Sequence, residues 1–279
     1  MKRFFFLFLA LILSLCIGIA IADDASDFFF IQIADTQLGM TSGSKDMTAE
    51  IENFNRAVEH INRLKPAFVI ISGDMINADL NPTQIRAFWK IARKISPSIR
   101  LYLVPGNHDV GKANEGNIHF YIKYFGKDHY SFSYKGTDFI VLNSCLIQDA
   151  DGDENLRTTQ REWFESELEA AKKRNPNHIF VCTHHAWFLK DINENDTYFN
   201  IPKPERDVYI ALMKRFGVDY ALAGHLHDES KAKYGSLTMI TTSSLGKALG
   251  QTPVGFRVFN VYKDRVEHKY YPLDKVPER

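Results

Sequence analysis

Apolar strand-like runs and amphipathic helical patterns alternate early in the chain, and this alternation restricts the fold more than any other feature of the sequence. Strands are predicted at 28–34, 68–71 and 101–104, where apolar residues follow one another almost without interruption. Between them, 48–64 and 83–95 carry apolar residues at three- and four-residue spacing, which predicts helices. The resulting β-α-β-α-β order is typical of a parallel sheet with helical crossovers.

Shorter elements of both kinds fill the rest of the chain. Further helices are predicted at 118–125, 158–173 and 205–216. Further strands are predicted at 130–134, 139–143, 178–183, 218–223, 231–234, 237–241, 256–262 and 266–271. We expect the strands from residue 231 onward to build a second sheet. Because no linker, repeat or low-complexity tract interrupts the pattern, we expect residues 23–279 to form a single domain.

The first 22 residues have the pattern of a secretory signal peptide. Lys2 and Arg3 precede an apolar run over 4–21, and Ala20-Ile21-Ala22 supplies a small-x-small cleavage pattern before two aspartates. We therefore expect a protein of the secretory pathway, either secreted or endolysosomal. The apolar run is also long enough to cross a bilayer, so an uncleaved signal anchor that tethers the protein to a membrane is the alternative.

The charge balance of the mature chain gives no reason to expect a nucleic-acid polymer as partner. Removing Lys2 and Arg3 with the leader leaves 32 basic residues against 34 acidic ones, a net charge of −2, and no Lys/Arg cluster stands out. We expect no membrane contact beyond the leader, and a monomer. Cys145 and Cys182 each end an apolar strand, so buried thiols are favoured over a disulfide. Asn195 begins a glycosylation sequon.

Polar side chains that suit metal binding follow five of the predicted strands. They are Asp35 and Gln37, Asp74 and Asn77, Asn107 with His108 and Asp109, His184, and His225 with His227. Because the carboxyl ends of parallel strands lie along one edge of a sheet, we expect these side chains to converge. The most specific of these motifs follows a Pro-Gly turn and places an amide, an imidazole and a carboxylate on consecutive residues.

The mixture of carboxylate, imidazole and amide ligands indicates a borderline or hard divalent ion and argues against a thiolate site. There are enough ligands for two ions that share one carboxylate, an arrangement that clamps a phosphoryl group and acidifies a bridging water. Asp35 and Gln37 are two residues apart, as are His225 and His227, so on extended backbone the members of each pair point the same way. The ligands suit Mn, Fe, Zn or Mg without distinguishing them.

In order and spacing, these motifs resemble the five sequence blocks of the calcineurin-like metallophosphoesterase superfamily. The blocks are Asp35, Gly73-Asp74, Gly106-Asn107-His108-Asp109, His184 and Gly224-His225-Leu226-His227. The chain is also similar to the subfamily of calcineurin-like phosphoesterase-domain proteins described as serine/threonine phosphatases. That likeness covers 35–39, 130–132, 141–144, 198–200, 243–246, 255–258 and 268–271.

The resemblance implies an α/β fold, a four-layer α/β/β/α sandwich of two mixed sheets flanked by helices, with a dinuclear site at one edge. It also implies how two divalent ions, or one Fe and one divalent ion, would be held. The ligands of one ion would be Asp35, Gln37, Asp74 and His227. The ligands of the other would be the bridging Asp74 together with Asn107, His184 and His225.

The resemblance further assigns roles to residues around the ions. His108 would lie beside the phosphoryl group and either protonate the leaving alkoxide or stabilise the charge on the transferring group. Asp109 would orient His108. Asn77 is a looser candidate, either for a contact with a metal ligand or for a contact with the phosphate. Many superfamily members have histidine where this chain has Gln37, whose amide oxygen is a weaker ligand than imidazole for Zn or Fe. The narrower subfamily shares this glutamine.

The function that we predict is dinuclear-metal-dependent hydrolysis of phosphoesters, by a phosphomonoesterase that acts as a serine/threonine protein phosphatase. Its substrate would be a phosphorylated protein or a small phosphoester. Because a signal peptide is unusual for a cytosolic signalling phosphatase, a secreted or endolysosomal nucleotide or cyclic-nucleotide phosphodiesterase is the first alternative. The second is a non-catalytic domain that binds a metal or a phosphoprotein, and the intact His108-Asp109 pair argues against it.

Overall fold

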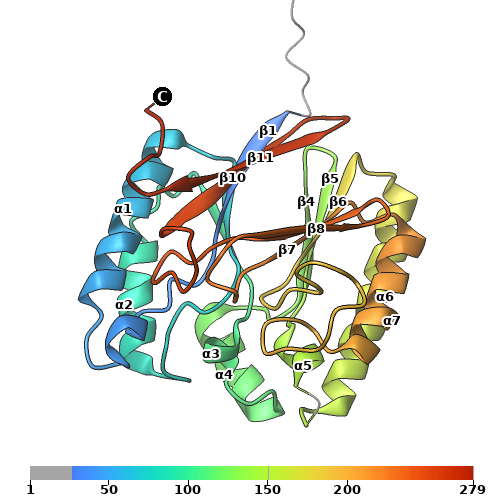
Figure 1. Cartoon of the computed structure of the whole chain (residues 1–279), viewed down its shortest axis with the longest axis horizontal. Helices are drawn as coiled ribbons and strands as arrows, with labels where there is room; N and C mark the ends of the chain where they lie inside the picture. Colours follow the sequence, from blue (N-terminus) through green and yellow to red (C-terminus); the bar gives the residue numbers. More distant parts are fainter. Residues whose placement is uncertain (1–26, 150, 279) are drawn as a thin grey trace, which may run out of the picture.

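Two stacked β-sheets form the centre of the computed structural model, which describes residues 27–149 and 151–278, and helices cover both outer faces (Figure 1). The strand order of the first sheet is β11 (Val266–Pro272), β10 (Gly255–Val261), β1 (Phe28–Ile33), β2 (Phe68–Ile71) and β3 (Arg100–Leu103). The order of the second is β4 (Tyr130–Tyr134), β5 (Thr137–Val141), β6 (His178–Cys182), β7 (Tyr220–Ala223), β9 (Leu237–Thr241) and β8 (Ser230–Tyr234).

Both sheets are mixed, with a parallel centre and antiparallel edges. In the first sheet β1, β2 and β3 run parallel, as the early β-α-β-α-β pattern predicts, while β10 and β11 are antiparallel. In the second sheet β5, β6, β7 and β9 are parallel, and the hairpin strand β4 and the strand β8 are antiparallel to their neighbours. The central strands are buried on both faces, which is why their sequences are almost continuously apolar.

Long amphipathic helices supply the two outer layers. They are α1 (Thr48–Leu64) and α2 (Pro82–Ala92) over the first sheet, and α6 (Glu154–Arg174) and α7 (Lys203–Phe216) over the second (Figure 1). Side-chain caps fix two of their starts: Asn81 accepts from backbone N–H groups at the start of α2, and Asp153 does so at the start of α6. Shorter helices lie in the loops, namely η1 (Met40–Ser42), α3 (Asn107–Val110), α4 (Glu115–Phe125) and α5 (Cys145–Gln148).

Aromatic side chains fill the space between the two sheets. Phe30 stacks on Phe259 within the first sheet, with ring centroids 4.7 Å apart, and meets Phe139 and Phe180 of the second sheet edge-on at 5.4 and 5.7 Å. Edge-to-face and offset-stacked pairs of this kind add to the free energy of apolar burial. The sheets are therefore held face to face by a dry core, and their loops are fixed relative to one another.

The structure confirms the predicted α/β/β/α sandwich but corrects the origin of the second sheet. Its parallel centre comes from the middle of the chain, and of the tail strands only β8 and β9 join it. The hairpin of β10 and β11 joins the first sheet beside β1, where Phe259 reaches the aromatic core and stacks on Phe30. Apolar alternation marks such a strand as half-buried but carries no information about which sheet it completes.

Several other expectations can be compared with the described residues. Cys145 and Cys182 are buried free thiols, as expected. The expected signal peptide over residues 1–22 lies outside the described residues. Within the described ranges, no helix combines the length and the apolar character that crossing a membrane requires.

Candidate metal centre

The carboxyl ends of strands from both sheets meet in one set of loops, and these loops carry the predicted ligands. Backbone hydrogen bonds tie the loops together: the Asp35 N–H donates to the Gly73 carbonyl at 3.1 Å, and the Gln37 N–H donates to the Asp74 carbonyl at 2.8 Å. The Gly224 N–H donates to the His184 carbonyl at 3.0 Å. Carboxylates and amides thus arrive from β1, β2 and β3, and imidazoles from β6 and β7, as the strand-end pattern predicts.

One group of these residues already has the spacing of a metal site. Asp74, His184 and His225 are buried, and each offers a ligand atom within 4.8 Å of the others. His184 Nε2 lies 3.3 Å from Asp74 Oδ2 and 3.0 Å from Asn107 Oδ1. We call Asp74, Asn107, His184 and His225 the first ligand group. Its carboxylate, imidazole and amide donors suit a divalent ion of the kind that the sequence predicts.

Backbone carbonyls fix the ring orientation of both histidines in the first ligand group. His184 Nδ1 donates to the Ser72 carbonyl at 2.8 Å, and His225 Nε2 donates to the Tyr198 carbonyl at 3.0 Å. Because a carbonyl can only accept, these nitrogens carry the protons and leave His184 Nε2 and His225 Nδ1 as the ligand atoms. Outer partners of this kind hold the tautomer and raise the basicity of a metal ligand.

A second ligand group, Asp35, Gln37 and His227, lies beside the first. His227 Nδ1 donates to the Lys247 carbonyl at 2.6 Å, which directs Nε2 to within 3.3 Å of Asp35 Oδ1. The Gln37 side chain is only 2% exposed, and its Oε1 is buried without a hydrogen-bond partner. A buried carbonyl oxygen without a partner is energetically costly. A metal ion at this position would satisfy it, so the residues present match the second ion that the resemblance implies.

The charges of the first ligand group are strongly coupled. Burial alone would raise the pKa of Asp74, but the charge and hydrogen bond of His184, with smaller contributions from His108 and His225, bring it below its usual range. Burial lowers the pKa of His184, but the Asp74 carboxylate outweighs this effect and raises it to about 9. Burial, aided by the charge of His184, lowers the pKa of His225 to about 4. Asp74 and His184 therefore stabilise each other's charged forms, and a divalent ion would take the place of the proton on His184 Nε2.

Unusual backbone conformations concentrate at the predicted ligands. Positive φ angles of 33° to 67° occur at Asp35, Gln37, Asp74, His225 and His227. Residues other than glycine rarely adopt this left-handed region, and when they do they often belong to functional sites. Close contacts add to the constraint, because a Cβ atom at Gly106 would lie 2.1 Å from the Asp74 nitrogen and one at Gly224 would lie 2.7 Å from Asp35 Oδ2.

His108 sits at the mouth of the cluster, but its supporting partner is not the predicted one. Its side chain is 30% exposed, Nδ1 donates to the Asn77 carbonyl at 2.6 Å, and the Asp79 carboxylate lies 3.8 Å away. Asp109 was expected to orient His108. Its oxygens instead accept backbone N–H groups of Met75, Ile76 and Gly106, at 2.8, 3.2 and 3.0 Å.

The short helix α3 explains this correction. Consecutive helical residues point about 100° apart, so Asp109 turns inward while His108 turns toward solvent. Asp109 therefore fixes the loops after β2 and β3 and is a structural support of the centre. Burial and the neighbouring Asp74 charge raise the pKa of the Asp109 carboxyl.

The loop between β6 and α7 brings a residue to the centre that the ligand pattern does not identify. Tyr198 is 59% exposed, its carbonyl holds His225, and its hydroxyl accepts from Asn107 Nδ2 at 3.4 Å. Trp187 and Phe188 of the same loop are buried in the core under the helices. The signals in the sequence were the length of the loop, its aromatic content and the likeness of 198–200 to the phosphatase subfamily, and none of them says which group Tyr198 contacts.

The fold and the centre together define a class of protein. A four-layer sandwich whose two sheets deliver carboxylate, amide and imidazole ligands to one buried cluster is the architecture of a metal-dependent phosphoric ester hydrolase. The family described as calcineurin-like phosphoesterase matches residues 30–229. The chain belongs to this family.

Relatives and solved structures support the same assignment. The serine/threonine-protein phosphatase CPPED1 of Mus musculus is 32% identical over 267 residues, which cover 90% of this chain and 86% of that protein. CPPED1 of Homo sapiens is also 32% identical, over 269 residues and the same shares. A dimetal phosphatase from Danio rerio has a TM-score of 0.67 at 15% identity, over 88% of this chain and 96% of that chain. The last likeness concerns the fold alone. The predicted family, fold and phosphatase class are thereby confirmed.

Proposed function

We propose that this chain is a dinuclear-metal-dependent phosphomonoesterase that removes phosphate from serine and threonine residues of proteins. The observation that carries the proposal is the buried Asp74-His184-His225 cluster with the partly exposed His108 beside it. The backbone N–H of His108 donates to Asp74 Oδ1 at 2.9 Å, and the imidazole Nδ1 donates to the Asn77 carbonyl, so the main chain and the ring of His108 are both held beside the cluster. The similarity to serine/threonine phosphatases over most of the chain supports the choice of substrate.

The two ligand groups divide between two ions. Asp74, Asn107, His184 and His225 would hold one ion, and Asp35, Gln37 and His227 would hold the other, with Asp74 shared. When bound, the ions supply Lewis-acid charge to the phosphoryl oxygens and make a water molecule acidic enough to attack. Asp74 is buried, its Oδ2 lies 3.3 Å from His184 Nε2, and its carbonyl accepts from the backbone N–H of Gln37 in the second group. A residue that adjoins both groups in this way suits the role of bridging ligand.

His108 is the residue that would move a proton. Its Nδ1 is committed to the Asn77 carbonyl, so Nε2 is the nitrogen free to protonate the leaving oxygen of a serine or threonine. The Asp79 carboxylate lies 3.8 Å from Nδ1, on the side of the ring away from the nitrogen that would transfer the proton. Tyr198, exposed beside His225, offers an aromatic wall for the part of the substrate next to the phosphate.

A His108→Ala variant tests this assignment. We expect the rate on an aryl phosphomonoester to fall by roughly 10²- to 10⁴-fold, the range typical of a general acid, with two metal ions still bound. His119→Ala, an exposed histidine of α4, is the matched control and should keep the wild-type rate. Metal content is measured by mass spectrometry, and activity is measured on an aryl phosphate and a phosphoserine peptide.

Two results would overturn the proposal. Metal-loaded wild-type protein that is inert on every phosphoester tried would indicate a non-catalytic domain. A rate on an aryl phosphodiester that exceeds the monoester rate by orders of magnitude would replace the phosphatase with a phosphodiesterase.

We also infer that residues 1–22 direct the chain into the secretory pathway and that residues 23–279 act there as one monomeric domain. The pattern of charge, apolar run and cleavage site supports the inference. Asn195 of the sequon is exposed, as a glycosylation acceptor must be. N-terminal sequencing of protein from a secretory host should find Asp23 first and a glycan on Asn195. A membrane-bound chain that retains Met1 would favour the anchor instead.

A further inference from the structure

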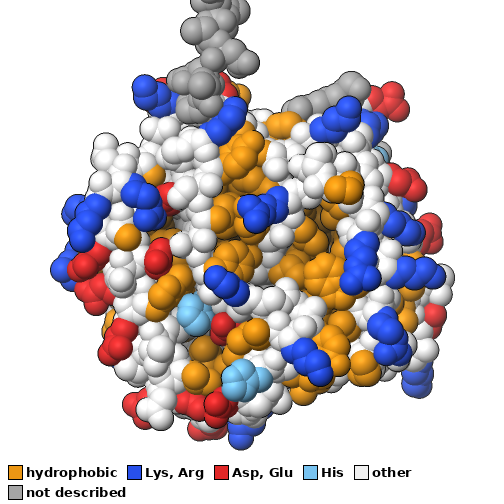
Figure 2. All heavy atoms as spheres, turned by 180° about the vertical axis from the view of Figure 1, so that it is seen from behind, with side chains coloured by type: hydrophobic (Ala, Val, Ile, Leu, Met, Phe, Trp, Pro, Cys, Tyr) orange, Lys and Arg blue, Asp and Glu red, His pale blue; other side chains and the backbone are white. Residues whose placement is uncertain are grey.

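Among the described residues, β3 and β4 each pair with a strand on one side only, so each is an edge of its sheet. The first sheet ends at β3 and the second at β4. Between them lies a groove of about 380 Å³, lined by Trp89, Arg100, Leu101, Tyr102, Leu103, Phe125, Lys127 and Tyr130. Figure 2 shows the face turned away from the viewer in Figure 1, with apolar side chains gathered near its middle and Lys and Arg side chains set among them. We call the groove that these eight residues line the β3 groove.

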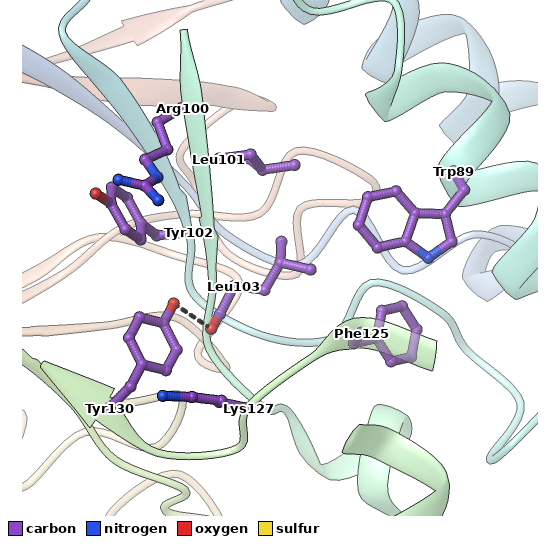
Figure 3. Close-up of a pocket in the computed structure, with 8 residues that line it drawn as sticks. All are labelled: Trp89, Arg100, Leu101, Tyr102, Leu103, Phe125, Lys127 and Tyr130. Atoms are coloured by element: carbon purple, nitrogen blue, oxygen red, sulfur yellow. Dashed lines mark hydrogen bonds between the residues drawn. The ribbon is translucent and has the colours of Figure 1, made fainter. Parts of the chain in front are cut away.

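Main-chain groups on the edge of β3 point toward the β3 groove, and one of them, the Leu103 carbonyl, already has a partner in Tyr130. The Val104 N–H donates to the Ile71 carbonyl of β2, whereas the preceding Leu103 carbonyl points outward and accepts from the Tyr130 hydroxyl at 2.9 Å (Figure 3). Peptide groups of successive residues alternate in direction along a parallel ladder, so those of Leu101 also point away from β2. An edge of this kind is a template for an additional strand.

Side chains divide the β3 groove into two unlike halves. Leu101 and Leu103 point toward Trp89 and Phe125, which form an apolar wall from α2 and α4 (Figure 3). Tyr102 points to the opposite side, where the Arg100 guanidinium lies 5.7 Å from its ring and Tyr130 and Lys127 complete the lining (Figure 3). One half of the groove is therefore apolar, and the other is aromatic and cationic.

The charge of this surface is one-sided. Arg100 and Lys127 are exposed, and none of the described residues that line the β3 groove is acidic. An adjoining hollow shares Trp89 and adds three cations, Arg86, Arg93 and Lys123. The nearest carboxylate in sequence, Asp128, is buried and paired with His129 at 2.9 Å. On the other side, a hollow that shares Lys127 and Tyr130 contains Glu167, which accepts a hydrogen bond from Ser131. A partner with acidic side chains would therefore meet positive charge within the β3 groove itself.

We propose that the β3 groove binds an extended segment of the phosphoprotein substrate, in which apolar and acidic residues alternate, as an additional strand on β3. The proposal rests on the proposed function for the nature of the partner. Alternate side chains of a strand point to opposite faces, so one set would enter the apolar half and the other would face Arg100 and Lys127. Because β3 leads directly into Asn107, a segment held on β3 is tethered to the element that carries a predicted ligand.

Peptide binding tests the β3 groove without any turnover. The probe is a fluorescein-labelled eight-residue peptide of alternating Glu and Ile, compared with the same peptide carrying Lys in place of Glu. We expect the acidic peptide to bind wild-type protein, and the double variant Arg100→Glu/Lys127→Glu to bind it roughly tenfold more weakly or less. Hydrogen exchange of the Leu101 and Leu103 amides should slow when the peptide is bound, which is the signature of strand addition.

A matched variant controls for net charge. Lys231→Glu/Lys233→Glu makes the same change on β8, the exposed edge strand at the other end of the second sheet, and should leave binding unchanged. Both variants should keep the wild-type rate on a small aryl phosphate, while only Arg100→Glu/Lys127→Glu should lower kcat/KM on a phosphoserine peptide fused to the Glu-Ile segment.

Several outcomes would overturn the proposal. Equal binding of the Glu and Lys peptides, or loss of binding in the β8 variant instead, would refute the groove. The groove would also be refuted if wild-type protein bound phosphatidylserine vesicles but not the acidic peptide, and if the vesicle binding disappeared in Arg100→Glu/Lys127→Glu. A protein that binds the peptide but is inert on all phosphoserine substrates would refute the proposed function and keep the groove, whereas an active phosphatase that does not bind the peptide would refute the groove alone.

Discussion

The two ligand groups are built in different ways. In the first, both histidines are held by carbonyls and their free nitrogens converge with Asp74 within 4.8 Å. In the second, His227 is held by a carbonyl in the same way, but Gln37 keeps a buried oxygen without a partner. In the first group, the polar atoms already lie within contact distance of one another. In the second group, the Gln37 oxygen lacks a hydrogen-bond partner, and a metal ion would take that place. We therefore expect the two groups to bind metal with unequal affinity, the first more tightly.

The largest effect should come from the residue that both groups share. Asp74→Asn removes the bridging charge, so we expect loss of both ions and a fall in rate beyond the roughly 10- to 100-fold typical of outer partners of a metal ligand. Metal analysis and the aryl phosphate rate measure the two effects. Asp264→Asn, at an exposed carboxylate between β10 and β11, is the control. Retention of both ions in Asp74→Asn would remove Asp74 from the bridge.

The glycines behind the two groups should differ in their tolerance of a side chain. A Cβ atom at Gly106 would clash with backbone of Asp74, which cannot move easily, whereas one at Gly224 first meets an Asp35 side-chain oxygen. Gly106→Ala should therefore lower the free energy of unfolding by about 1–3 kcal/mol, and Gly224→Ala by less. Urea unfolding of metal-free protein measures both. A larger loss of stability for Gly224→Ala than for Gly106→Ala would contradict this order.

A Gln37→His variant tests whether the Gln37 amide is the reason that the second ligand group binds metal more weakly than the first. An imidazole is a stronger ligand than an amide oxygen for Zn or Fe, so the weaker of two Zn-binding steps should become tighter by roughly tenfold. Calorimetric titration of metal-free protein resolves the two steps. Gln37→Leu, which removes the oxygen but keeps the volume, should abolish the weaker step and leave the tighter one. If Gln37→His instead strengthens the tighter step, the order of affinities is reversed.

The smallest expected effect is a change in the pH dependence of stability, and it concerns Arg257 and its partners near His227. Arg257 is buried; it pairs with Glu229, two residues after His227, and donates to His268 Nδ1 at 2.7 Å. Burial, together with the Arg257 charge, lowers the pKa of His268 to about 4. The folded-state pKa thus lies below the unfolded value of about 6.5. Stability from the neutral ring is present above pH 6.5 and is lost as pH falls toward 4.

Unfolding free energies of metal-free protein at pH 7 and pH 5 measure this contribution. His268→Gln keeps an acceptor for Arg257 but cannot titrate, so its loss of stability on acidification should be smaller than that of wild type. For a half-buried group we expect a difference of about 1 kcal/mol or less after solvent screening. Identical pH dependence in the two proteins would show that His268 does not titrate as described.

The sequence predicted where the candidate ligands gather better than it predicted what surrounds them. Asp35, Asp74, His184 and His225 follow strands whose apolar runs are unmistakable, and the ends of parallel strands must converge. The histidines of the centre are oriented by backbone carbonyls, of Ser72 for His184, of Tyr198 for His225 and of Lys247 for His227. A carbonyl leaves no mark in a sequence because every residue has one.

The role of Asp109 was wrong for a related reason. Adjacency in sequence suggested contact with His108, but the short helix α3 turns the two side chains apart. The pairing of β10 with β1 could not be predicted either, because strand order depends on which edge a distant segment meets. The sequence specifies well where polar residues lie relative to the ends of strands. It specifies poorly which helix or strand from a distant part of the chain packs beside each element.

The origin of the ligands in two separate sheets has a thermodynamic consequence. Asp35, Asp74 and Asn107 follow strands of one sheet, and His184, His225 and His227 follow strands of the other, so chelation would join the halves of the sandwich at a point remote from the aromatic core. Ligands drawn from distant parts of a chain come together only when the chain folds, so metal affinity would be part of the folding free energy. The melting temperature would then report metal occupancy, and a chelator would act on the whole protein as a mild denaturant.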